Sequence, residues 1–324
     1  MTNSERHISE SALIARKESK EHEPANRLET DVYIIRHGTA MPAVEDGRSE
    51  DERDFERSLS PKGINEVKTT GQVIGEELKK IQSEGLVFMV RSSHITRAYQ
   101  TLETAAGEIA ELLGVPMSSP ELPFPPAQGK FAYTTKNYAF PPFISAGPHK
   151  QAMERMGGRS GKEWKGGATL PEQWVRDPSI LAKDLDAAGI TDISAEDVIA
   201  ERTENFTKNA AVWAKAGAVL RKGWENDLGK EKSEKKQKGF DVSDATPPRL
   251  VVLAGTHGAI VPESWLYEII KEYESQTGEQ ISPALGYAEY FKVHLPAHPD
   301  ETPTLEIHGK TIPVRWEMFK VKQK

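Results

Sequence analysis

Residues 31–38 read DVYIIRHG, and they indicate the architecture more clearly than any other segment. The segment begins with a mostly β-branched apolar run, which is typical of a strand buried on both faces in a parallel sheet. Arg36, His37 and Gly38 stand where this strand should end. The stretch therefore predicts an α/β protein whose first strand carries charged and reactive side chains at its carboxyl end.

Two further segments have the same form. Residues 86–90 (LVFMV) run into Arg91-Ser92-Ser93, and residues 250–254 (LVVLA) run into Gly255-Thr256-His257. Between the first two strands, Ser60-Pro61 opens a predicted helix with proline at its first position. We expect its apolar face to consist of Ile64, Val67, Val73, Ile74, Leu78 and Ile81.

A second helix is predicted from about residue 95 to 113, with Gly114 as the residue that ends it. Residues 115–117 suggest a short third strand, so the chain alternates strand and helix, which implies a parallel sheet with right-handed crossovers. After the strand at 250–254 we expect a helix over 261–273, a strand over 287–294 and a hairpin around 308–310.

The alternation is interrupted by an insertion at about residues 122–245, which is too long for a plain loop. It should be mainly helical and lie over the strand ends as a cap, with a solvated loop at the lysine-rich residues 229–239. Residues 1–29 are predicted to be a disordered or weakly ordered tail, and residues 30–324 a single domain. The expected fold is a three-layer α/β/α arrangement around a mostly parallel sheet. The expected buried positions of the insertion are Trp174, Leu181, Leu185, Val198, Phe206, Val212 and Trp213.

Composition limits the function classes. The 324 residues carry a formal net charge of −7, which favours neither nucleic acid nor an anionic membrane as a partner. The absence of cysteine excludes a disulfide framework, a thiolate zinc site and a cysteine nucleophile. No apolar run approaches the roughly 20 residues that span a bilayer, and residues 1–30 lack the apolar core of a signal peptide. The expected location is cytoplasmic.

The three strand ends should meet, because ligands of open parallel sheets bind beyond the carboxyl ends of the strands. This would bring together Arg36, His37, Arg97 and His257. Arginine matches phosphate oxygens with a planar fork of donors, and a neutral imidazole can attack phosphorus when its other ring nitrogen is held. The set predicts phosphoryl transfer to a histidine, by a scheme that needs no metal or cofactor.

The same segments resemble a known family. Residues 32–38 look like the signature of the histidine phosphatase superfamily, also called phosphoglycerate mutase-like. Residues 92–101 (SSHITRAYQT) are similar to its second motif, and His257-Gly258 resembles its third. Residues 59–63 (LSPKG) match the family's loop into the first helix. The resemblance covers roughly residues 31–121 and 249–294.

Carried to this chain, the resemblance implies that His37 is the phosphorylated nucleophile. Arg36 and Arg97 would grip the phosphoryl group, and His257 would complete the pocket. Ser93 and Thr39, at the same strand ends, are further candidates for substrate binding. Members of the family often have a general acid after the third strand, and Glu121 is the nearest carboxylate here. The acid could equally come from the insertion, or be dispensable for a substrate with a good leaving group.

The expected substrate is a phosphorylated small molecule or a phosphoprotein. Near Glu121 the chain resembles the short bacterial phosphohistidine phosphatases, as does the stretch at residues 54–60 (DFERSLS). A phosphomutase is the alternative enzyme, although residues 39–42 (TAMP) replace the Ser or Thr and Trp-Asn pair usual in mutases. A member that binds or scaffolds phosphorylated ligands without catalysis is the alternative of another class.

Overall fold

A computed structural model gives the structure of the chain. It describes residues 27–42, 56–82, 85–92, 96–114, 117–118, 131–132, 148, 151–152, 155–156, 172–237, 247–256 and 263–320. The strands are β1 Thr30–Arg36, β2 Leu86–Ser92, β3 Met117–Ser118, β4 Phe131–Ala132, β5 Arg249–Thr256, β6 Tyr290–Leu295, β7 Thr304–Ile307 and β8 Lys310–Pro313. The helices are α3 Pro61–Lys79, α4 Thr96–Leu113, α6 Glu172–Arg176, α7 Pro178–Ala187, α8 Ala195–Gln237 and α9 Glu263–Thr277, with a 3-10 turn at Trp316–Phe319.

The central sheet has the strand order β2-β5-β1-β6-β7-β8. Its first three strands are parallel, and β6, β7 and β8 continue it in antiparallel fashion. The hairpin predicted around residues 308–310 is confirmed, because His308 and Gly309 take φ values of 48° and 74° between β7 and β8. Of the short strand expected at 115–117, only Met117 is among the described residues. It begins β3, which pairs with β4 in a separate two-stranded sheet.

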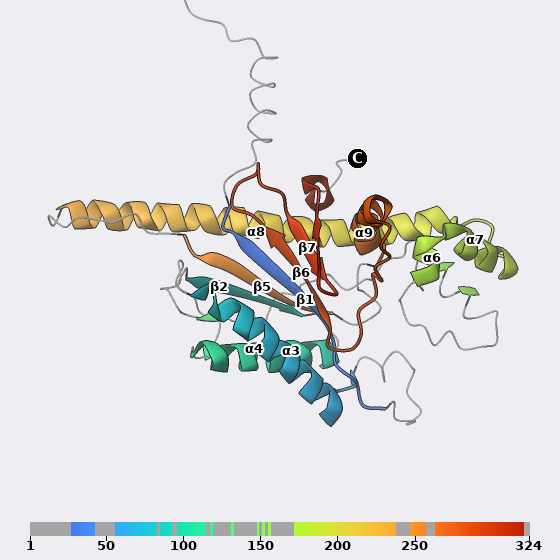
Figure 1. Cartoon of the computed structure of the whole chain (residues 1–324), viewed down its shortest axis with the longest axis horizontal. Helices are drawn as coiled ribbons and strands as arrows, with labels where there is room; N and C mark the ends of the chain where they lie inside the picture. Colours follow the sequence, from blue (N-terminus) through green and yellow to red (C-terminus); the bar gives the residue numbers. More distant parts are fainter. Residues whose placement is uncertain are drawn as a thin grey trace, which may run out of the picture.

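Helices cover both faces of the sheet, which confirms the three-layer α/β/α architecture. Alternate residues of β1 enter different cores: Val32 and Ile34 pack with α8 and α9, whereas Tyr33 and Ile35 pack with α3 and α4. Figure 1 shows α3 and α4 on one side of the sheet and α8 and α9 on the other. The parallel part of the sheet is thereby buried on both faces.

The first helix is where predicted, but its buried face differs. Ser60 caps α3, since its Oγ accepts a hydrogen bond from the amide of Gly63 at 3.0 Å. Ile64 and Val73, expected in the core, are 38% and 48% exposed. The predictions for Val67, Ile74 and Leu78 are confirmed, and the buried face is completed by Gly63, Gly71 and Gly75. Glycine leaves room for α4 to approach closely, so the apolar pattern alone misplaces part of this face.

The segment expected as an insertion supplies part of the sheet's covering layer. Phe206 and Trp213 of α8 are buried against β1 and β5, and the amide of Leu28 donates to the carbonyl of Gly217 at 3.1 Å. The expected buried positions are confirmed except for Val212, which is 53% exposed. The loop predicted at 229–239 is wrong up to Gln237, because α8 continues to that residue and reaches past the sheet (Figure 1). Residues 122–130 and 133–147 lie outside the described residues, so a cap over the strand ends stays a prediction.

The packed part of the chain begins earlier than the predicted domain boundary at residue 30. Leu28 is only 1% exposed, so the packed part of the chain already includes residues before Thr30. Among the described residues, no helix combines the length and the hydropathy that a membrane crossing requires.

Candidate active site

The three parallel strands end at one edge of the sheet, as predicted. Arg36 at the end of β1 lies beside Thr256 at the end of β5, and Ser92 of β2 lies beside Gly255. The amide of His37 continues the ladder by donating to the carbonyl of Thr256 at 2.8 Å. His257, Ser93 and Glu121 lie outside the described residues, so their places at this edge stay predictions.

His37 is held in one tautomer. Its side chain is 6% exposed, and its Nδ1 lies 2.7 Å from the carbonyl oxygen of Gly38. Its Nε2 lies 3.1 Å from Nε of Arg97, which is a donor only. Because a carbonyl only accepts and a guanidinium only donates, Nδ1 carries the proton and Nε2 carries the lone pair. The ring therefore presents a basic nitrogen next to a fixed positive charge.

Arg97 comes from the first turn of α4 and is itself 6% exposed. Its backbone carbonyl accepts a hydrogen bond from Oγ1 of Thr101 at 2.8 Å. The same hydroxyl oxygen accepts from the amide of Gly38 at 3.4 Å. Thr101 thus ties the start of α4 to the residue after His37, a role that the sequence did not assign to it.

Arg36 reaches the loop that precedes β6. One of its terminal nitrogens, Nη1, donates to the carbonyl of Leu285, and its Cζ lies 4.7 Å from the ring centroid of Tyr287. Its Nε is buried and has no hydrogen-bond partner among the described residues. A buried N–H donor without an acceptor is energetically costly, and a bound anion would supply that acceptor.

Tyr287 was not anticipated as part of the site. Its ring centroid is 5.7 Å from that of His37, with the ring planes at 44°, while the side chain is 52% exposed. The sequence carries no motif for this residue, since an aromatic residue in a loop has no periodic signature. The loop meets the site only because β6 pairs with β1.

Two glycines allow the segment after His37 to pack closely against the start of α3. A Cβ on Gly38 would lie 2.5 Å from the carbonyl oxygen of Gly63, and a Cβ on Gly63 would lie 2.1 Å from that of Thr39. Either distance is far below a normal contact between carbon and oxygen. The glycines that follow His37 and that open α3 are therefore needed for the same close approach.

The amide and hydroxyl of Thr39, which could bind a substrate, are both hydrogen-bonded to Glu66. Its amide donates to Glu66 at 2.9 Å, and its hydroxyl lies 2.9 and 3.0 Å from the two carboxylate oxygens. Burial raises the pKa of Glu66, but the Thr39 bonds and the charge of Lys62 outweigh it, so the pKa lies below its ordinary value. These contacts fix the loop after His37, and substrate binding by Thr39 stays a prediction.

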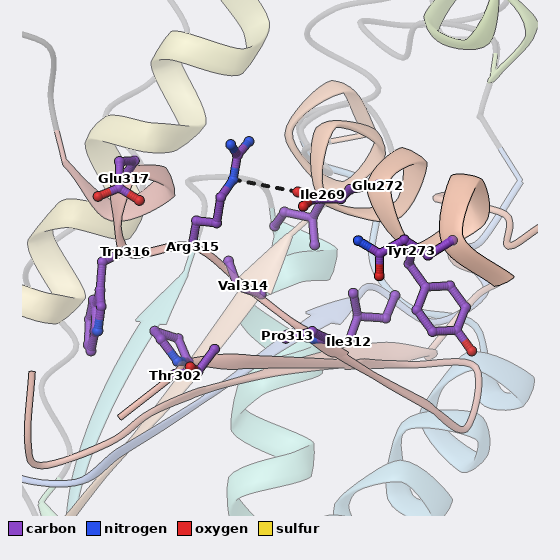
Figure 2. A pocket seen from close by; sticks show the side chains of 12 residues that line it. Ile269, Glu272, Tyr273, Thr302, Ile312, Pro313, Val314, Arg315, Trp316 and Glu317 are labelled. Atoms are coloured by element: carbon purple, nitrogen blue, oxygen red, sulfur yellow. Dashed lines mark ion pairs between the residues drawn. The ribbon is translucent and has the colours of Figure 1, made fainter. Parts of the chain in front are cut away.

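The surface of the described part is hollowed in several places, of which the following bear on the site. One, of about 670 Å³, lies between α3 and the β7–β8 hairpin and includes Tyr287 in its wall. The other, of about 280 Å³, lies between α9 and the C-terminal residues around Trp316. Figure 2 shows the second cavity, where Arg315 reaches Glu272 over 3.6 Å. Its lining contains no candidate catalytic residue, whereas the first cavity includes Tyr287, which packs against His37.

Comparison with solved structures finds matches at low sequence identity and low TM-score. The chain is similar to a putative phosphohistidine phosphatase SixA from Agrobacterium tumefaciens, at 12% identity over 85% of this chain and 92% of that one, with a TM-score of 0.27. It is also similar to a Hafnia alvei phytase in complex with myo-inositol hexakis sulphate, at 13% identity over 86% and 84%, with a TM-score of 0.32.

A mycobacterial glucosyl-3-phosphoglycerate phosphatase is similar as well, at 17% identity over 81% of this chain and 90% of that one, with a TM-score of 0.25. No protein-family model and no curated protein matches the sequence.

Proposed function

We propose that the protein is a phosphatase of the histidine phosphatase superfamily and that His37 is its nucleophile. The observation that carries the proposal is the 3.1 Å contact between Nε2 of His37 and Nε of Arg97. A lone pair that can attack phosphorus lies beside a cation that can hold phosphoryl oxygens, at the edge where parallel strands end. The sequence motifs at residues 32–38 and 92–101 support the same assignment.

In the first step, the lone pair of Nε2 attacks the phosphorus of a bound phosphomonoester. A P–N bond forms while the P–O bond to the leaving group breaks, and the leaving oxygen keeps the electron pair. That oxygen takes a proton from a general acid, for which Glu121 is the candidate, or from solvent when it is already stable as an anion. The products of the step are phosphohistidine and the free alcohol.

In the second step, water attacks the phosphorus of phosphohistidine. The P–N bond breaks, its electron pair returns to Nε2, and the proton of the water passes to the carboxylate or to solvent. Inorganic phosphate leaves, and the starting tautomer is restored because the Gly38 carbonyl, 2.7 Å from Nδ1, holds the Nδ1 proton throughout.

Arg36, Arg97 and His257 stabilise the charge on the transferring group. Arg36 offers the buried Nε without a partner among the described residues, and Arg97 already points at His37. Fixed donors of this kind stabilise the transition state because they need no rearrangement when the charge develops. The phosphorylated substrate is a small molecule or a phosphoprotein.

The experiment is to trap phosphohistidine. Purified protein is mixed with radiolabelled acetyl phosphate or an aryl phosphate and quenched in alkali, where phosphohistidine survives, and hydrolysis is followed in parallel. Wild-type protein should be labelled and should turn over, while His37→Ala should do neither. His298→Ala, at an exposed loop histidine, is the matched control and should behave as wild type.

Three other outcomes would contradict the proposal in different ways. Label on His37→Ala would remove His37 as the nucleophile. Transfer of the label to a second phosphate acceptor, rather than to water, would identify a phosphomutase. Binding of phosphate compounds without any labelling would favour the non-catalytic alternative.

A further inference from the structure

The loop that carries Tyr287 is fixed although the side chain is exposed. The carbonyl of Leu285 accepts a hydrogen bond from Arg36, and the carboxylate of Glu289 accepts from the amide of Gly286 at 2.6 Å. On the other side, Oγ1 of Thr70 donates to the carbonyl of Ala288 at 2.6 Å. The ring is therefore held at a defined place at the edge of the candidate active site.

Tyr287 belongs to two regions at once. It packs against the guanidinium of Arg36 and the ring of His37, with centroid distances of 4.7 and 5.7 Å. It also lines the cavity of about 670 Å³ between α3 and the β7–β8 hairpin. Tyr287 is thus shared by the candidate active site and the cavity, so a leaving group that extends from a phosphoryl group at His37 into the cavity would lie beside its ring.

The cavity differs in charge from the phosphoryl site. Four carboxylates line it, from Glu66 and Glu77 of α3, Glu289 and Glu306. The lysines around it pair with carboxylates and neutralise part of this charge: Lys62 lies 3.6 Å from Glu66, and Lys292 lies 3.4 Å from Glu306 and 4.0 Å from Glu77. Lys310 lies 2.7 Å from Glu279, so the carboxylates outnumber the lysines. His308 also lines the cavity, with its Nδ1 4.0 Å from Glu289.

An anionic group in this cavity would meet an excess of carboxylates and would be repelled. A cationic group would be attracted by them, and it would also find an aromatic ring at the entrance. Alkylammonium groups bind to the faces of aromatic rings through the ring quadrupole. Both features favour the same kind of ligand.

We propose that Tyr287 and this cavity form the leaving-group subsite and that they select substrates whose leaving group carries an alkylammonium cation. The proposal rests on the proposed function, because it takes the phosphoryl group to be held at His37. It assigns Tyr287 as a specificity-determining residue and disfavours substrates that carry a second phosphate on the leaving group.

The test compares two alkyl phosphates of similar size, phosphocholine and glycerol 3-phosphate. Wild-type protein should have a lower KM for phosphocholine. Tyr287→Ala should raise that KM by roughly tenfold, as expected for loss of a cation–π contact, and should change the KM for glycerol 3-phosphate by less than about twofold. Tyr287→Phe keeps the ring and should retain the preference.

Charge is tested separately with Glu306→Gln, which should raise the KM for phosphocholine by about two- to fivefold at low salt and less at high salt. Glu111→Gln removes the same charge from an exposed position on α4 and is the matched control. Equal changes in KM for both substrates, or no preference in the wild type, would overturn the proposal.

A binding measurement separates this proposal from the proposed function. Choline and glycerol are titrated calorimetrically into wild type, Tyr287→Ala and His37→Ala, with no phosphoryl group present. Choline should bind more tightly than glycerol to wild type and to His37→Ala, and Tyr287→Ala should lose the difference. If phosphohistidine never forms but choline still binds in this way, the subsite stands and the catalytic assignment fails. If choline binds no better than glycerol, the subsite is wrong whatever His37 does.

Discussion

Arg97 donates a hydrogen bond from its Nε to Nε2 of His37 across 3.1 Å, and both side chains are 6% exposed. The contact joins the end of β1 to the first turn of α4, two elements that are separated by α3 and β2 in the chain. It orients the imidazole while no substrate is bound, and it keeps a positive charge at the place where the phosphoryl oxygens would lie.

Arg97→Lys should therefore reduce kcat far more than it changes stability. Lysine keeps the charge but lacks the planar fork that can bind the ring nitrogen and the phosphoryl oxygens together. We expect kcat to fall by roughly 10²–10³, the usual effect of removing one transition-state donor. Steady-state kinetics on an aryl phosphate measures this, with Arg315→Lys at an exposed ion pair as the control. A loss of less than threefold would show that the guanidinium geometry is unimportant.

The proposed role of Glu121 as general acid can be tested by comparing substrates with different leaving groups. A general acid matters only when the leaving oxygen is a poor anion, so Glu121→Gln should slow alkyl phosphate hydrolysis by roughly 10²–10⁴ and aryl phosphate hydrolysis far less. Rates for a matched alkyl and aryl pair measure the difference. Small, equal effects on both would move the search for the acid to the insertion, or would indicate a natural substrate with a good leaving group.

The close approach of two glycines should make both positions intolerant of alanine. In Gly63→Ala the new Cβ would lie 2.1 Å from the carbonyl oxygen of Thr39, and backbone cannot move aside as a flexible side chain can. We expect the free energy of unfolding to fall by about 1–3 kcal/mol and phosphorylation of His37 to be impaired. Urea denaturation followed by circular dichroism measures the stability.

Gly229→Ala is the matched control for this prediction. Gly229 lies in α8, and among the described residues no other element comes within 4 Å of its added Cβ. Alanine there should raise stability by up to about 1 kcal/mol, because it has the higher helix propensity. A Gly63→Ala variant as stable as wild type would contradict the geometry of the loop.

Asp31 should make stability depend on acid pH. Its side chain is 1% exposed and is bonded to Nδ1 of His294 at 2.8 Å and to Arg249 at 3.1 Å. Burial raises the pKa of Asp31, but the His294 bond and the charges of Lys292, His294 and Arg249 outweigh it, so the pKa is lowered. A carboxyl with a lowered folded-state pKa stabilises the fold above its unfolded value of about 3.9, and this contribution is lost as pH falls through the folded-state pKa.

Asp31→Asn should consequently cost roughly 1–3 kcal/mol at pH 7, since it weakens the bonds to His294 and Arg249, while Arg249 keeps Glu29 at 2.7 Å. Its free energy of unfolding should fall less steeply than that of wild type below about pH 4. Urea titrations at a series of pH values measure both effects. Parallel pH profiles for the two proteins would show that Asp31 does not titrate in the expected direction.

Local patterns predicted the elements that carry the site. A β-branched run followed by Arg36 and His37 specified β1 and its polar end, and Ser60-Pro61 and Gly114 specified where α3 begins and where α4 ends. These signals are short-range, because a cap or a strand end depends on the residue itself and its immediate neighbours.

The packing of helices was less predictable. Ile64 and Val73 were expected in the core because they are apolar, but both are exposed, and α4 approaches α3 closely at Gly71 and Gly75. Glycine carries no hydrophobic signal, so a pattern search cannot identify it as an interface residue. The lysine-rich end of α8 was misassigned for a related reason: lysine, glutamate and glutamine are good helix formers as well as typical loop residues.

The sequence by itself determined the α/β class and the ends of the central strands, because strand burial and helix caps are encoded in short segments. Only the tertiary structure decided which nitrogen of His37 holds the lone pair, since this depends on Gly38 on one side and Arg97 on the other. It alone brought Tyr287 to Arg36 and His37, because that contact follows from the pairing of β6 with β1 across more than 250 residues of chain. Long-range pairing is set by the packing of the whole sheet, and no local segment carries it.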